Sequence, residues 1–532
     1  MSQEQPPQYN YDRRRLILGL IAIFLSYGTM AYYLQALGIA RPKIAAELDG
    51  MSIYSWSVSI VGLIGAFVTL IYGKLSDIYG RRIMLLISTS IALLGSILSV
   101  FSTTFVFFII ASAIGALGGG AMMPLVFAVV GDMFPPIERS KWVGMLQIPM
   151  GIAALFGPAL GGWFADTIGW RYLFWSIALL QILCLIMVPL GIPPLAHRST
   201  KPKIDIWGCL LVIVASSTTI IGISLGGVTY PWTSMPIITL LGIALISWIL
   251  FFRVEYGAEE PILDPIVLRN RSFNTVAVSG FLSFFGMMAM MMYFPMFLQG
   301  VQGISATLSG WIFTPYSVMI AFVGVPVGFL LARTRRYKWM YITGYGIVTA
   351  AMFGVILFSE DTPILFSVII ATLAGLGLGA IPTVNTIVIQ NAVPKRLLGA
   401  AMGASFFCLM MAVAIAPAIL GTADRAAYDK ALAASLPAGL DQVADKATMA
   451  SLADSKVLLS KPDMAALENI FKQKGSEGEA LFHQTVDAIR TSMVAGLRSV
   501  FWIGAISTLL SFLLIITIPE IPIGSKEPGA ES

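Results

Sequence analysis

Long apolar stretches separated by short polar ones form the main pattern of this 532-residue chain. Most of the apolar stretches are about 20 residues long, which is the length an α-helix needs to cross about 30 Å of hydrocarbon. We predict fourteen spans, at residues 16–38, 55–73, 83–102, 105–130, 142–165, 172–192, 205–226, 235–252, 273–297, 307–331, 339–358, 364–389, 398–421 and 499–518. The expected fold class is therefore an all-α polytopic membrane protein with 14 transmembrane helices.

Lysine and arginine are distributed unevenly between the two sides that these spans define. The segments on the side of the N-terminus hold 21 of the 33 basic residues, and the short loops opposite hold 3. The other 9 lie in or at the end of one long loop, 422–498, where charge has little effect on orientation. The positive-inside rule predicts that both termini are cytoplasmic and that the long loop is extracytoplasmic. We expect a multi-pass protein of the cell inner (plasma) membrane.

Composition agrees with this class, with 57% hydrophobic and only 11% charged residues. The net charge of +5 comes from short loops rather than from one patch, so we expect no nucleic-acid partner. All three cysteines fall inside apolar runs, without metal or disulfide spacing. The apolar run after Arg13–Arg15 is too long for a signal peptide, so we interpret it as a retained first helix.

The polar stretch Gly73–Arg82 is the most informative motif of the chain. Two glycines permit tight or left-handed backbone, an acid can face the positive N-terminus of a helix, and two arginines can reach a phosphate or a carboxylate. The simpler interpretation is a basic loop that only fixes orientation. The predicted gating residues are Gly73, Asp77, Gly80, Arg81 and Arg82.

The fifth predicted span carries a second motif, formed by small residues around a proline. Gly157 and Gly161 make a GxxxG pair that allows close helix packing, and Pro158 bends the span. Generic packing of small residues is the simpler interpretation. The full set of motif residues is Gly151, Gly157, Pro158, Gly161 and Gly162.

The first motif resembles the signature between helices 2 and 3 of the major facilitator superfamily, and the second resembles the helix-5 motif of its antiporter branches. The segments 293–305 and 390–394, together with Pro315, resemble the fourteen-helix drug:proton antiporter branch. This resemblance implies the major facilitator fold, with two six-helix bundles and two inserted helices. It also implies a second copy of the Gly73–Arg82 stretch after the tenth predicted span, 307–331. There Ala332 stands at the position that Asp77 has in the first copy.

These bundles give the expected division of the chain. The parts are a cytoplasmic N-terminus 1–15, an N-terminal bundle 16–192, two inserted helices 205–252, a cytoplasmic amphipathic linker 253–272, a C-terminal bundle 273–518 that includes the loop 422–498, and a cytoplasmic tail 519–532. For the long loop, a small helical cap is favoured over disorder.

Other chemistry lacks the residues that it needs. The match to G-x-S-x-G at 222–226 lies within an apolar span, without the histidine partner of a nucleophile elbow. The chain has no Walker loop and no HExxH motif, and we see no charged ring of a channel. We therefore expect neither an enzyme nor a cofactor or metal site.

A substrate cavity between the bundles should be lined by polar, aromatic or flexible apolar side chains. The candidates are Tyr27, Tyr33, Gln35, Gln147, Met291, Tyr293 and Asn385. The ninth predicted span, 273–297, contributes its methionines because thioethers suit several hydrophobic ligands, although these methionines could equally fill helix contacts.

The resemblance implies proton coupling, but this chain lacks the acid and the arginine that the family has at the matching positions. Tyr33 stands at about the position of the family's helix-1 acid, and Ser112 stands at that of its helix-4 arginine. Tyrosine titrates at about pH 10, so it does not cycle a proton at physiological pH. Protonic coupling would then depend on acids at the ends of the spans, namely Asp77, Asp132 or Asp166, or the substrate itself would carry the charge.

The expected function is secondary active transport, with efflux of amphipathic or hydrophobic small molecules by alternating access. The alternatives are a transporter dedicated to one metabolite, lipid or siderophore and, more remotely, a non-transporting membrane sensor. The expected partners are a small-molecule substrate, protons and membrane lipid, and we expect a monomer.

Overall fold

The computed structural model describes residues 13–50, 53–194, 205–227, 230–258, 261–437, 468, 471 and 475–520. Within these residues it has fourteen helices long and apolar enough to cross a membrane, and no β-strand beyond one isolated bridge. The predicted spans are thus all present. The predicted parts 1–15 and 519–532 lie largely outside the described residues.

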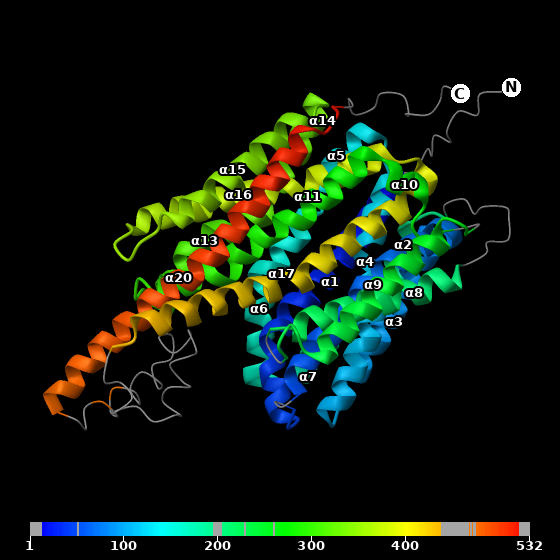
Figure 1. Ribbon diagram of the computed structural model, residues 1–532. Coiled ribbons are helices and arrows are strands. Elements are labelled where there is room, and N and C mark those ends of the chain that lie inside the picture. Colours follow the sequence, from blue (N-terminus) through cyan, green and yellow to red (C-terminus); the bar gives the residue numbers. More distant parts are fainter. Residues whose placement is uncertain are drawn as a thin grey trace.

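The first six spans form one group of packed helices, coloured blue to cyan in Figure 1. Five are single helices, and the fifth span is divided into three consecutive pieces. The bounds are α1 Arg13–Glu47, α2 Tyr54–Tyr79, α3 Arg81–Val100, α4 Phe105–Met133, α5 Pro136–Met145, α6 Gln147–Trp163 with the π-turn Phe164–Ile168, and α7 Trp170–Gly191.

The last six spans form the second group, coloured green to red in Figure 1. Breaks at Ala289 and Val323 divide its first two spans. The bounds are α11 Arg271–Met288, the π-turn Ala289–Tyr293, α12 Phe294–Gly300, α13 Ala306–Phe322, α14 Gly324–Thr334, α15 Lys338–Ile356, α16 Ile364–Ala392, the 3₁₀ turn Lys395–Leu397, α17 Leu398–Ser435 and α20 Gly475–Ile516.

Two helices lie between these groups in sequence and beside them in space. The inserted helices α8 (Ile206–Leu225) and α9 (Met235–Glu255) pack on each other, and α8 also packs against α2 and α17. The predicted linker contains the short helix α10, Pro265–Arg269, whose N-cap Asp264 accepts a hydrogen bond from the Ile266 amide. The inserted pair therefore contacts both bundles.

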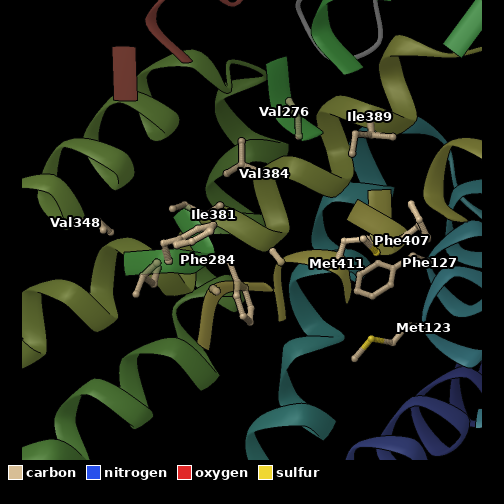
Figure 2. Close-up of a cluster of buried hydrophobic side chains, with 14 of the residues drawn as sticks. Met123, Phe127, Val276, Phe284, Val348, Ile381, Val384, Ile389, Phe407 and Met411 are labelled. Carbon is tan, nitrogen blue, oxygen red and sulfur yellow. The ribbon is translucent and has the colours of Figure 1, made fainter. Parts of the chain in front are cut away.

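The two bundles meet along α17, which packs on α2 of the first bundle and on α11 and α20 of the second (Figure 1). Figure 2 shows the apolar side chains at this border, where Phe127 of α4 lies beside Met411 and Phe407 of α17. The rings of Phe127 and Phe406 are 5.4 Å apart, centroid to centroid. The core is therefore continuous across the border.

The long loop is shorter than predicted, because its two ends are helical. α17 continues unbroken to Ser435 and α20 begins at Gly475, so the boundaries 422 and 498 mark where the apolar sequence ends and not where the helices end. The two extensions pack on each other, with the Ser435 and Ser492 hydroxyls 3.4 Å apart and Asp424 lying against Gly496. Most of residues 438–474 lie outside the described part of the chain.

Candidate functional site

The Gly73–Arg82 stretch is helical except at one residue. α2 runs to Tyr79, Gly80 adopts φ 90°, and α3 starts at Arg81. Only glycine adopts this conformation without strain, and it lets two helices follow each other without a loop. The predicted polar loop is thus a sharp corner that carries its charges on helix ends.

Asp77 uses both carboxylate oxygens to cap a helix of the other bundle. Its Oδ1 accepts from the Gly399 amide at 2.9 Å, and its Oδ2 accepts from the Ala400 amide at 2.7 Å. These amides belong to the first turn of α17, where backbone N–H groups have no intrahelical partner and the helix dipole favours an anion. The acid of the Gly73–Arg82 stretch therefore faces a helix N-terminus, and that helix is α17 of the other bundle.

Arg81 is buried behind this contact and joins two carboxylates. Its guanidinium pairs with Asp77, and its Nε donates to Asp132 Oδ2 at 2.8 Å. The side chains of Arg81 and Asp77 are only 4% and 6% exposed, so the charges are strongly coupled. Arg82, next in sequence, is partly exposed. We call the contact of Asp77, Arg81 and Asp132 with Gly399 and Ala400 the gate contact.

Glycines bring α2 and α17 into backbone contact beside these charges. A Cβ atom on Gly73 would lie 2.8 Å from the Gly403 Cα, and one on Gly403 would lie 2.6 Å from the Thr69 carbonyl oxygen. Real Cβ contacts are longer than 3.0 Å, so a larger residue at either position would push the two helices apart.

The same packing occurs a second time, between α14 and α5. A Cβ on Gly328 would lie 2.5 Å from the Ser140 carbonyl oxygen and 2.9 Å from the Gly144 Cα. Ala332, one turn after Gly328, is buried where the first copy has Asp77. The repeat therefore keeps its close helix packing and lacks the acidic cap.

The helix-5 motif divides between two contacts. Gly157 and Gly161 pack against Gln35 and Ala36 of α1, within the first bundle. Gly151 faces the other bundle, since a Cβ there would lie 3.0 Å from the Ala321 Cβ on α13. Pro158 is inside α6, and Gly162 packs loosely near Ile39.

The predicted cavity residues do not all converge. Tyr27 is buried with its ring edge-on to Phe127, 5.6 Å between centroids, and Gln147 packs at Gly324 of α14, so both lie at the bundle border. Asn385 accepts from the Tyr341 hydroxyl at 2.8 Å, inside the second bundle. Three further candidates lie elsewhere: Gln35 at the α1–α6 contact, Met291 half-exposed, and Tyr293 buried near Gly421.

Tyr33 faces the helix-4 position that the sequence analysis pairs with it. Its hydroxyl lies near Ser112 and 3.9 Å from where a Gly115 Cβ would be. The side chains that meet here from α1 and α4 are therefore two neutral hydroxyls.

Some contacts between the bundles were not predicted from the sequence. Gln390 of α16 is buried and donates to the Phe127 carbonyl of α4 at 2.8 Å. Glu255 and Asp424 are also buried, beyond the ends of the drawn spans. Gln390 is the first residue of the segment 390–394 that supported the family resemblance, and this position was the available signal. No cluster of three or more His, Cys, Asp or Glu suited to a metal occurs among the described residues.

Comparisons with known proteins place this geometry in a family. The Major Facilitator Superfamily model matches residues 19–417. The multidrug transporter protein MdtP of Bacillus subtilis is 29% identical over 97% of this chain and 94% of its own length. Multidrug resistance protein 3 of the same organism is 29% identical over 78% of this chain and 80% of its own. An uncharacterized MFS-type transporter of Mycobacterium tuberculosis, Rv1877, is 31% identical over 75% of this chain and 58% of its own.

Solved structures agree at the level of the fold. The human organic anion transporter MFSD10 gives a TM-score of 0.60 at 14% identity, over 96% of this chain and 100% of that one. The proton:xylose symporter XylE gives a TM-score of 0.56, also at 14% identity, over 96% and 97%.

Proposed function

Because the chain belongs to the Major Facilitator Superfamily, we propose that it exports amphipathic or hydrophobic small molecules by alternating access. The single observation that carries the mechanism is the capping of α17 by Asp77, which joins the two bundles at one end through buried charge. Bundles joined at one end can rock apart there only by breaking that contact.

The gate contact acts as a reversible lock in this proposal. Asp77 and Arg81 belong to the first bundle, and Gly399 and Ala400 belong to the second, so bundle separation exposes the carboxylate and two amides to water. Hydration then replaces the lost hydrogen bonds, and the net cost is modest. A lock of this kind stabilises one state without trapping the transporter in it.

The proposed substrate class rests on the names of relatives and on the side chains that line the border between the bundles. Two bacterial relatives are named for multidrug transport or resistance, and a relative in Dothistroma septosporum is named an efflux pump. The bundle border is lined by Tyr27, Phe127, Phe406 and Met411, which suit apolar and aromatic ligands. Uptake of one dedicated metabolite has no comparable support.

A substrate panel tests this function. Cells with and without the protein are compared for growth inhibition and accumulation across amphipathic dyes, antimicrobials and detergents, with Asp77→Asn as the variant of reduced transport. We expect increased resistance to several chemically unrelated compounds. An effect on a single metabolite, lipid or siderophore would replace the multidrug proposal with a dedicated transporter, and an unchanged panel with a lost signalling output would favour a sensor.

The orientation follows from charge. We place the α2–α3 corner, both termini and the gate contact in the cytoplasm of a cell with the protein in its inner (plasma) membrane, because the basic residues gather on that side. The gate contact then closes the cytoplasmic end, and the structure corresponds to the outward-facing half of the cycle. The α17–α20 extensions project on the opposite side.

A further inference from the structure

The two inserted helices meet α2 at a small pocket on a face of α2 next to the gate contact. Lys74 of α2, Asp205 and Cys209 at the start of α8, and Ile262 of the linker line this pocket. The apolar part of the same inserted pair reaches α17, where the rings of Trp248 and Phe407 are 5.8 Å apart. The pair therefore bridges the two helices that the gate contact joins.

Two carboxylates come together on the inserted side of the pocket. Glu255, at the end of α9, is 2% exposed and accepts from the Leu263 amide at 3.0 Å and the Ile262 amide at 3.3 Å. Asp205 caps α8 by accepting from the Gly208 amide at 2.8 Å through Oδ1, and its Oδ2 is buried without a hydrogen-bond partner.

Gly208 shows how close these two side chains are. A Cβ atom on Gly208 would lie 2.8 Å from Glu255 Oε1 and closer still to Asp205 Oδ2, so both oxygens approach the same point. Two carboxylates held near each other out of water repel, so either one of them takes up a proton or a nearby cation compensates their charge.

The candidate cation is Lys74 of α2. Lys74 is 5% exposed, and its ammonium acts electrostatically on Glu255. Lys74 lies three residues before Asp77 on α2, so the two charges leave the helix in neighbouring directions. α2 thus places Asp77 against α17 and Lys74 in the pocket that Asp205 of the inserted pair also lines.

We propose that Lys74, Asp205 and Glu255, the charged junction, are positioning residues that make the inserted helix pair a second lock on the gate. The inference rests on the proposed alternating-access function. The contact of the pair with α17 is apolar, and such contacts gain little over lipid in a membrane, so the charged junction supplies the specific attachment to α2. Loss of this attachment frees α2 and favours separation of the bundles at the α2–α3 end.

The test measures the gate directly. Spin labels at the exposed positions Glu138 of α5 and Arg333 of α14, in a parent without the three native cysteines, report the distance between the bundles at the α2–α3 end. We expect Lys74→Gln and Glu255→Gln each to raise the population of long distances several-fold. The charge-swapped double variant, Lys74→Glu with Glu255→Lys, should restore most of the short-distance population.

The Lys43–Asp166 pair supplies the matched control. Its atoms are 3.0 Å apart, but it is exposed and lies within the first bundle, so Lys43→Gln and Asp166→Asn should leave the distances unchanged. If Lys74→Gln is poorly produced, the test is carried by Lys74→Arg and Glu255→Gln. Lys74→Arg keeps the positive charge at position 74, and Glu255→Gln keeps the side-chain shape at position 255. Unchanged distances in Glu255→Gln, while Asp77→Asn widens them, would overturn the charged junction and leave the gate standing. Distances that respond to neither variant would contradict the gate itself.

Discussion

At the scale of residues, the gate contact concentrates three ionised side chains around one helix start. Arg81 balances Asp77 and Asp132, and Asp77 accepts the hydrogen bonds from the helix start of the second bundle. A buried ion pair is destabilised strongly when one partner is removed, because the other charge is left without compensation. Here Arg81 keeps Asp132 when Asp77 is neutralised, so the first bundle should still fold.

Asp77→Asn is therefore expected to slow transport while the protein remains in the membrane at normal abundance. Asparagine keeps one carbonyl oxygen but turns an NH₂ group toward the Gly399 or Ala400 amide, and it removes the charge that faces the helix dipole. The dipole interaction is worth about 0.3–2 kcal/mol, enough to shift a nearly balanced equilibrium several-fold. Substrate efflux from vesicles measures the rate, with Asp166→Asn as the control. An unchanged rate would mean that the stretch only fixes orientation.

At the scale of elements, the backbone contact between α2 and α17 depends on glycine and on helix ends meeting in register. Gly399 is crowded by the Gly73 carbonyl and by the Asp77 and Arg81 side chains, so the cap and the close packing require each other. The second copy, α14 on α5, has the packing without the acid. The two sides of the border are therefore unequal, and the first carries the specific lock.

Gly73→Ala should weaken closure of the gate without unfolding the protein. The added methyl group would meet Gly399 and Gly403 backbone atoms that cannot move independently of α17, and overpacking of this kind costs about 1–3 kcal/mol. Gly62→Ala on the same helix is the control, because nothing lies within 4 Å of the added atom. Both variants are compared by transport rate and by the inter-bundle distance of the spin labels. Equal behaviour of the two would show that close approach at Gly73 is not needed.

Sequence predicted the elements well because each span must satisfy its backbone within itself and be apolar over a fixed length. It misplaced the ends of α17 and α20, since a helix can continue into water once its residues turn polar, as at the exposed Arg425. It missed Glu255 because the drawn span ended three residues earlier, and burial there depends on the linker folding back. Which helices Gly73 and Gly151 contact depends on tertiary packing, which periodicity does not encode.

At the scale of the whole molecule, the distribution of basic residues predicts how the bundles lie across the membrane. Cytoplasmic reporters fused at Ser532, Ser199 or Tyr337 should be active, and an extracytoplasmic reporter should be active within residues 422–498. The first two sites lie outside the described residues and test the orientation independently of the fold. A cytoplasmic reporter active in the long loop would contradict the orientation.

The energy source of transport is also a property of the whole molecule. In the described spans, these acidic side chains lie near or beyond the ends of the apolar segments, with Asp77, Asp132 and Glu255 at the α2–α3 end and Asp166 and Asp424 at the other. At the centre, Tyr33 meets Ser112 rather than an acid meeting an arginine. Asp166 is 74% exposed, which makes it a poor carrier of a coupled proton. We therefore expect coupling through Asp77 or Asp132, or transport driven by the charge and gradient of the substrate.

These alternatives differ in their response to two separable gradients. A cation moving down the membrane potential enters the cell with about 2.3 kcal/mol per charge per 100 mV, and an anion leaves, so an exporter without strong proton coupling should favour anions or neutral molecules. Proteoliposomes with the pH gradient and the potential imposed separately should show that the potential accelerates export of anionic dyes and opposes that of cationic ones. Weak acceleration by the pH gradient should disappear in Asp77→Asn or Asp132→Asn and survive in Asp166→Asn. Strong acceleration by a pH gradient alone that survives all three substitutions would contradict coupling through these acids. It would direct the search to Glu255 and Asp424, the buried acids that lie beyond the apolar spans.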